Sequence, residues 1–319
     1  MNSRERIEAV LAGERPDTTP IFPKIAFATA RFCEGMTVKD YMTDPKSMAK
    51  SVIHAYHRFG WDGVALHTDI SSEGMALGSI YEQPQDAPPI LKKYLLDDIG
   101  EIDKVKVPDP YTACSMKTVI EAVRLVKQEI GREAYLLGWT NGPLNVAAQI
   151  FNLDELLVAL IEEPEKVHAL LERCTEVACA YAEALIGAGA DMIAYGHATA
   201  SSNVISKNYY LEFALPYEKK LVQTIHDHGA KALTHICGNI EGIVDAISQN
   251  GADVIDFDYV CDIDALKEKV PDKIFRGNIN PVIFAEGTPE EMEEAVRSLL
   301  SQKGTDTNFF LGSGCEINL

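Results

Sequence analysis

Short apolar runs that alternate with amphipathic stretches dominate the pattern of this chain. We count eight such runs, at 21–27, 61–66, 134–138, 191–195, 232–236, 253–257, 274–277 and 308–311. Several are apolar almost throughout, as strands covered on both faces must be. Apolar residues at helical spacing predict intervening helices at 116–130, 154–187, 209–228, 240–250 and 289–301.

This alternation of strand and helix predicts an α/β fold, a closed parallel TIM (β/α)8 barrel rather than an open sheet. No glycine-rich dinucleotide-binding turn follows any run, which argues against a Rossmann fold. A helix should precede the first strand, because Asn2 can cap it and Glu5 stands at the capping-box position. The chain stops four residues after Cys315, so we expect the last outer helix to be truncated. We interpret residues 1–319 as a single catalytic barrel domain, since no linker or shift in composition divides them.

The charge balance narrows the choice of partners. Lys and Arg number 29 and Asp and Glu number 48, so the net charge is −19 at pH 7. A chain this acidic is not expected to bind nucleic acid or to dock on an anionic membrane. No apolar signal core is present at the start, and no apolar run approaches the ~20 residues that span a bilayer. We therefore expect a cytoplasmic protein whose seven cysteines are thiols.

Three soft ligands stand at the carboxyl ends of predicted strands. His235 and Cys237 end the fifth run, and residues two apart in an extended segment point to the same side. Cys315 follows the eighth run on a glycine-flanked loop. One imidazole and two thiols suit tetrahedral zinc, and three protein ligands leave a coordination position open, as in catalytic sites. The plainer alternative is that these are ordinary buried cysteines, because a His-x-Cys pair alone is a weak pattern.

A family resemblance rests on several segments spread over nearly the whole chain. They are GWTNGPLNVAAQI (138–150), EFALPYEKKL (212–221), THICGN (234–239), GADVIDFDYVCDI (251–263), RGNINP (276–281), GTPEEMEEAV (287–296) and LGSGCEI (311–317). Together they resemble the uroporphyrinogen decarboxylase superfamily, and within it the cobalamin-dependent methyltransferase branch. The superfamily is similar to a TIM barrel, in agreement with the strand count.

Two departures favour the methyltransferase branch. The decarboxylases carry paired arginines in the first loop, and the corresponding stretch here, PKIAFATARF (23–32), lacks that motif although Lys24 and Arg31 are basic. They also end in a Gly-His-Gly loop, where this chain has Gly-Ser-Gly-Cys. The pattern of His235, Cys237 and Cys315 resembles instead the zinc ligands of methylcobalamin:coenzyme M methyltransferases. The resemblance implies a zinc cofactor and a corrinoid supplied by a partner protein.

Two carboxylates after the second run are candidate substrate-binding residues. Asp69 resembles the substrate-contacting aspartate of the decarboxylases, and Glu73 is a candidate for the fourth zinc position. The alternative is that both are solvated loop carboxylates or charges at a helix N-terminus.

Four more residues at strand ends are candidate substrate-binding residues. Tyr195 and His197 follow the fourth run, Asp258 the sixth and Asn278 the seventh. Asp258 is expected either to hydrogen-bond a zinc-bound imidazole or to cap the next helix. The alternative for His197 is a surface loop histidine.

These observations predict a zinc-dependent methyltransferase that moves a methyl group between a corrinoid protein and a small acceptor or donor. A thiol such as coenzyme M, activated as a zinc thiolate, is the archetype of the branch. Tetrahydrofolate and methoxylated or methylated amine substrates remain open. The alternatives are a cofactor-free decarboxylase of a tetrapyrrole carboxylate and a non-catalytic corrinoid- or metal-binding module.

Overall fold

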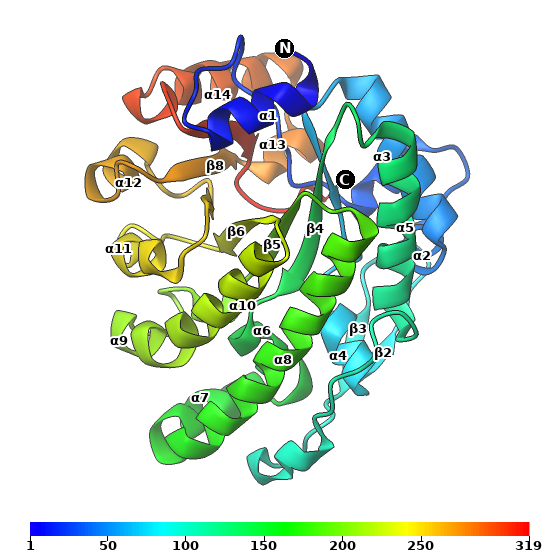
Figure 1. Ribbon diagram of the computed structural model, residues 1–319, viewed down its shortest axis with the longest axis vertical. Helices are drawn as coiled ribbons and strands as arrows, with labels where there is room; N and C mark the ends of the chain where they lie inside the picture. The colour runs from blue at the N-terminus through cyan, green and yellow to red at the C-terminus, as the bar shows by residue number, and fades with distance from the viewer. Residues whose placement is uncertain (319) are drawn as a thin grey trace.

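The computed structural model describes residues 1–318 and is built around one parallel sheet (Figure 1). Neighbouring strands of the sheet follow chain order, so each strand returns beside its predecessor through a helical connection. The strands are β1 (Gly63–Leu66), β4 (Tyr135–Asn141), β5 (Met192–Gly196), β6 (Lys231–Ile236), β7 (Val254–Phe257), β8 (Ile274–Ile279) and β9 (Phe309–Ser313). They correspond to seven of the eight predicted runs.

The first predicted run closes the ring without forming a full strand. Phe22 N donates to Leu311 O (2.7 Å), and Leu311 N donates to Pro20 O (2.9 Å), which attaches this segment to β9. On its other side, Asp62 N donates to Ile21 O (2.8 Å) just before β1 begins. Pro23 has no N–H to continue the ladder, so pairing stops at a single bridge. The TIM-barrel prediction is confirmed, except that the first predicted run, at 21–27, forms only this bridge and not a full strand.

Side chains from alternate strand positions fill the barrel, and α1 (Ser3–Leu11) covers its amino end. Ile7 and Val10 of α1 pack with Leu137, Met192 and Phe310 in one buried cluster. The predicted capping box is confirmed, because the Asn2 side chain accepts from Glu5 N and the Glu5 side chain accepts from Asn2 N. In Figure 1, α1 lies at the end of the molecule opposite α6 and α7.

Helices cover the outside of the sheet. They are α2 (Val38–Thr43), α3 (Pro45–Phe59), α4 (Ser72–Leu77), α5 (Cys114–Ile130), α6 (Pro143–Ile150), α7 (Leu153–Glu162), α8 (Pro164–Ala188), α9 (Lys207–Tyr209), α10 (Leu215–Asp227), α11 (Val244–Ile247), α12 (Ile263–Lys269), α13 (Pro281–Glu286) and α14 (Pro289–Leu300). The predicted helices at 116–130 and 289–301 are confirmed by α5 and α14.

Three predicted helices are interrupted. The helix predicted at 154–187 is two helices, because Pro164 cannot continue α7 and instead occupies the first turn of α8. The helix predicted at 209–228 contains a π-helical segment, Tyr210–Ala214, before α10. In the stretch predicted at 240–250, only α11 and a 3-10 turn at Ser248–Asn250 are helical.

The last strand, β9, is largely buried. Four of the five residues of β9 are buried, and Phe309 packs in the same cluster as Leu299 of α14. No single helix among residues 1–318 is long and apolar enough to cross a membrane; α6 and α7 reach that length only as a pair bent by 117°.

Replacing Asp62 by Ala should loosen the closure of the barrel. The buried Asp62 carboxylate accepts from Ile21 N (2.7 Å) and Arg6 Nη1 (3.1 Å), so its removal leaves both donors without an acceptor. We expect a loss of about 1–3 kcal/mol in the free energy of unfolding, measured in urea. Asp17→Ala removes the exposed partner of the same Arg6 and should cost less. Equal losses in the two variants would contradict this role for Asp62.

Candidate metal centre

A row of polar side chains crosses three strands inside the barrel. His235 of β6 is in register with Asp256 of β7, and Asp256 is in register with Arg276 of β8. Residues in register on parallel strands point to the same side of the sheet. His235 Nδ1 lies 2.8 Å from Asp256 Oδ2, while Arg276 Nε and Nη2 each donate to an Asp256 oxygen at 2.8 Å. All three side chains are buried.

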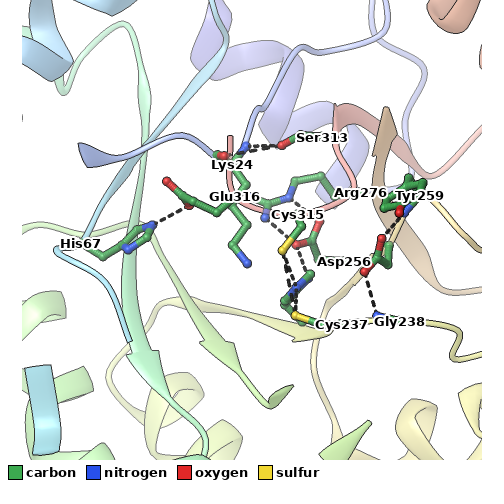
Figure 2. A network of polar contacts seen from close by, with 12 residues as sticks. Lys24, His67, Cys237, Gly238, Asp256, Tyr259, Arg276, Ser313, Cys315 and Glu316 are labelled. Atoms are coloured by element: carbon green, nitrogen blue, oxygen red, sulfur yellow. Dashed lines mark hydrogen bonds and ion pairs between the residues drawn. The ribbon is translucent and has the colours of Figure 1, made fainter. Parts of the chain in front are cut away.

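The second imidazole nitrogen of His235, Nε2, faces the thiols of Cys237 and Cys315 (Figure 2). His235 Nε2 lies 3.3 Å from Cys237 Sγ and 3.8 Å from Cys315 Sγ, and the two sulfurs are 3.9 Å apart. Tetrahedral zinc with ordinary Zn–S and Zn–N bonds separates its ligand atoms by about 3.5–3.8 Å. These three residues form a group that could hold a metal ion, and the spacing of their donor atoms fits zinc.

Glycines let the two cysteine loops approach each other. Gly238, next to Cys237, has a φ of +82°, a conformation that favours glycine. A Cβ on Gly314, next to Cys315, would lie 2.3 Å from Tyr259 N. Any larger residue at 314 would therefore push the Cys315 loop away from the loop after β7.

The hydrogen bond between the two thiols shifts their pKa values in opposite directions, so that the pair favours holding one proton between them. The hydrogen bond from Cys237, with a further contribution from His235, lowers the pKa of Cys315. The same contact, together with burial, raises the pKa of Cys237. Burial and Lys24 oppose protonation of His235, but the charge and hydrogen bond of Asp256 outweigh them and raise the pKa of the imidazole. Thiolate is the form of cysteine that binds metals, so the pair is disposed toward metal binding.

Asp256 holds the imidazole in place of the expected Asp258. The Asp258 carboxylate instead accepts from Gly238 N (2.7 Å) and Tyr259 N (2.6 Å), which ties together the loops after β6 and β7. Asn278 Nδ2 donates to the carbonyls of Asp258 (3.2 Å) and Cys261 (2.9 Å). Asp258 thus braces the loop that carries Cys237, and Asn278 braces the loop after β7. The expectation that Asp258 bonds the imidazole is wrong, because Asp256 is in register with His235 whereas Asp258 lies beyond the end of β7. The alternative that Asp258 caps the next helix is also wrong, because Asp262 caps α12.

The two carboxylates predicted after the second run do not join the metal cluster. Glu73 is fully buried and accepts from Thr140 Oγ1 (2.8 Å), Asn141 N (2.7 Å) and Asn141 Nδ2 (2.5 Å). Half-buried Asp69 accepts from Ser71 N (3.1 Å) and Ser71 Oγ (2.6 Å) just before α4. Glu73 lies in the first turn of α4, as the alternative of a charge at a helix N-terminus predicted, but it is buried and bonds α4 to β4. It is not part of the group of possible metal ligands.

Tyr195 and His197 lie between β5 and the helices, away from the metal cluster. Tyr195 packs in the cluster of residues between the sheet and the helices, whereas its neighbour Ala194 faces the barrel interior. His197 Nε2 lies 3.7 Å from Glu218 Oε1 of α10, and both side chains are fully buried. Burial lowers the pKa of His197 to about 3 and raises the pKa of Glu218 to about 7. The surface-loop alternative for His197 is therefore wrong. His197 N donates to His235 O (2.9 Å), but the side chains of Tyr195 and His197 do not belong to the metal cluster.

Several residues near the metal cluster are missing from the candidates drawn from the sequence, among them Lys24, His67 and Glu316 (Figure 2). Lys24 Nζ lies 4.2 Å from the centre of the Trp139 ring, and His67 Nε2 lies 3.2 Å from Glu316 Oε2. Glu316 directly follows Cys315, and it also accepts from Ala26 N (2.8 Å). Only the polar character of Lys24 and His67 beside apolar strands could have signalled them, because their partners are distant in the sequence.

Comparison with known proteins places this geometry in a family. The chain matches the uroporphyrinogen decarboxylase (URO-D) family over residues 2–319 and belongs to it. A methylcobamide:CoM methyltransferase, MtbA, of Methanosarcina mazei is 28% identical over 306 residues, covering 93% of this chain and 88% of that protein. A uroporphyrinogen decarboxylase of Colwellia psychrerythraea is 28% identical over 280 residues, covering 82% and 76%. The solved structure of a methyltransferase from Methanosarcina mazei shares the fold, with a TM-score of 0.90 at 21% identity over 99% of this chain and 94% of that one.

Asp256→Asn should destabilise the barrel strongly, because it leaves the buried Arg276 guanidinium without a negative partner. Breaking one side of a buried ion pair costs about 3–5 kcal/mol in the free energy of unfolding, and urea denaturation can measure it. Asp258→Asn is the matched control, since an amide oxygen can still accept from Gly238 N, and it should lose only about 1 kcal/mol. A smaller loss for Asp256→Asn than for Asp258→Asn would refute the importance of the row.

Glu218→Gln should change how stability depends on pH. Glu218 keeps its proton up to about pH 7 in the folded chain but ionises near its ordinary pKa when unfolded. The unfolded chain therefore binds fewer protons between about pH 4.5 and 7, so wild-type stability falls through that window. Relative to the wild type, the variant should gain roughly 2–4 kcal/mol from pH 5 to pH 8, as followed by urea unfolding. The control Glu268→Gln, at an exposed glutamate, should show no such gain. If the difference in the free energy of unfolding between Glu218→Gln and the wild type did not change with pH, the raised pKa of Glu218 would be contradicted.

Proposed function

We propose that this protein is a zinc-dependent methyltransferase that moves a methyl group between a corrinoid held by a partner protein and a small thiol, and that the barrel acts as one catalytic domain. The observation that carries the proposal is the convergence of His235, Cys237 and Cys315 at the carboxyl end of the barrel. Membership of the URO-D family and similarity to methylcobamide:CoM methyltransferases support the same class. Coenzyme M is the acceptor named for those relatives.

The proposed ligands suit a reaction in which a thiol becomes a nucleophile. His235, Cys237 and Cys315 would hold a zinc ion with one coordination position open, and the ion would lower the pKa of a substrate thiol there below its ordinary value of about 8.5. The substrate sulfur then forms a bond to the methyl carbon while the cobalt–carbon bond breaks and leaves its electron pair on cobalt. Asp256 fixes the imidazole tautomer through Nδ1, and Arg276 holds Asp256 ionised.

Decarboxylation of a tetrapyrrole carboxylate is the second candidate, because relatives at similar identity are uroporphyrinogen decarboxylases. The residues of the site speak against it. The first loop lacks paired arginines to hold several substrate carboxylates, and Arg31 is exposed. The two facing thiols have no evident use in cofactor-free decarboxylation.

The purified protein should contain about one zinc ion per chain, measured by metal analysis after zinc supplementation. Cys315→Ala and Cys237→Ala should lose most zinc and at least ~100-fold of methyl transfer from methylcobalamin to 2-mercaptoethanesulfonate, because a soft ligand is missing. Cys174→Ala, at a fully buried cysteine of α8, is the control and should retain zinc and activity. Circular dichroism should show folded barrels in all three variants.

Two results would contradict the proposal. Full methyl transfer by Cys315→Ala with zinc retained would show that this cysteine is not a ligand. Enzymatic release of carbon dioxide from uroporphyrinogen, without methyl transfer to any thiol, would favour the decarboxylase. Assays with tetrahydrofolate and methylated amines in place of the thiol decide the acceptor.

A further inference from the structure

The ammonium group of Lys24 is a buried charge without a counter-ion. Lys24 is 5% exposed, and among residues 1–318 no carboxylate oxygen lies within 4 Å of its Nζ. Lys24 Nζ lies over the face of Trp139, 4.2 Å from the centre of the ring. Burial of an unpaired ammonium is costly, so such a group is expected to be completed by a ligand.

The neighbouring carboxylates are already engaged. Glu316 contacts His67 Nε2 and accepts from Ala26 N, and Asp256 is bonded to Arg276 and His235. Asp258 accepts from two backbone N–H groups. Among residues 1–318, none of these three forms an ion pair with Lys24, although Glu316 Oε2 has no hydrogen-bond partner.

The fold holds Lys24 in a set position relative to the metal ligands. Lys24 N donates to Ser313 Oγ (3.2 Å), and Ile317 N donates to Lys24 O (2.9 Å), so its backbone is clamped on both sides of Cys315. From this clamp the side chain extends toward the space between His67 and Cys237 (Figure 2). Because Ser313 and Ile317 flank Cys315, this clamp places Lys24 beside the metal cluster.

Within the described part of the chain, unpartnered polar atoms near Lys24 include a donor, Trp139 Nε1, and an acceptor, Glu316 Oε2. Trp139 Nε1 is buried and has no hydrogen-bond partner among residues 1–318, and the indole can only donate. The Trp139 ring packs against His67 on one side, with centroids 5.2 Å apart, and lies 6.2 Å from the His235 ring. A cation, an unpaired N–H and an aromatic face together suit a small molecule with an anionic end and a short carbon chain.

We propose that Lys24 binds the anionic group of the acceptor and so sets the specificity for an anionic thiol. This inference rests on the proposed function, because the metal cluster supplies the site for the sulfur at the other end of the molecule. Lys24 is then a specificity-determining residue: it contacts the substrate but takes no part in bond making. A sulfonate or a carboxylate would satisfy it, whereas a neutral thiol of equal length would leave the ammonium unpaired.

The test compares two thiols that differ only in charge, 2-mercaptoethanesulfonate and 2-mercaptoethanol, on the zinc-loaded protein. Titration calorimetry should show that the wild type binds the anionic thiol about 10–100-fold more tightly. Lys24→Gln should lose that factor for the anionic thiol and change less than about twofold for the neutral one. In methyl transfer, the loss should fall on KM and not on kcat. Lys24→Arg should restore part of the affinity, and Lys117→Gln, at an exposed lysine of α5, should match the wild type.

Binding of ethanesulfonate, which has no thiol, separates this inference from the proposed function. If ethanesulfonate bound in a Lys24-dependent way to a protein that methylates no thiol, the anion site would be supported and the proposed methyltransferase function would be contradicted. Equal affinity of the wild type for the two thiols would overturn the role of Lys24 and leave the methyltransferase intact. An equal loss for both thiols in Lys24→Gln, accompanied by loss of zinc, would overturn it as well, because Lys24 would then serve only to offset the thiolate charge.

Discussion

A guanidinium group without access to water lies at the centre of this barrel. Arg276 is fully buried, and its counter-charge is Asp256, which it binds through two hydrogen bonds of 2.8 Å. Isolated charges at such a depth cost many kcal/mol, so β7 and β8 must keep the register that pairs them. The same carboxylate orients His235. The stability of the interior and the geometry of the metal ligands thus depend on one ionic contact.

Closure of the ring is the second condition for the site. The segment at residues 20–26 and the loop at 313–317 belong to opposite ends of the chain, and the bridge between Ile21 and Leu311 brings them side by side. Through this closure Lys24 lies beside Ser313, and Glu316 accepts from Ala26 N. Cys315 reaches Cys237 only because β9 is the neighbour of both β8 and the first segment. A barrel open at this seam would keep His235 and Cys237 but lose the third ligand.

Local rules predicted a large part of this arrangement. Alternation along an extended strand was enough to pair His235 with Cys237, and the apolar runs located seven strands. The same rules misplaced the helix at 154–187, where Pro164 breaks a continuous apolar period. The prediction also named Asp258, which follows β7, as a partner of the imidazole, whereas Asp256 within that strand bonds it. A charged residue within an apolar strand is in fact the stronger signal, since it must find a buried partner.

The sequence by itself therefore determined the barrel class, the family and the three residues proposed as zinc ligands, because each of these follows from periodicity or from short motifs. The tertiary structure alone decided that Asp256 and Arg276 support the imidazole, that Glu73 and His197 face away from the ligands, and that Lys24 lies beside them. These relations join residues that are about 20 to 290 positions apart. Their physical basis is strand register and closure of the barrel, which together determine which side chains share the barrel interior. Neither can be seen in the local spacing of residues along the sequence.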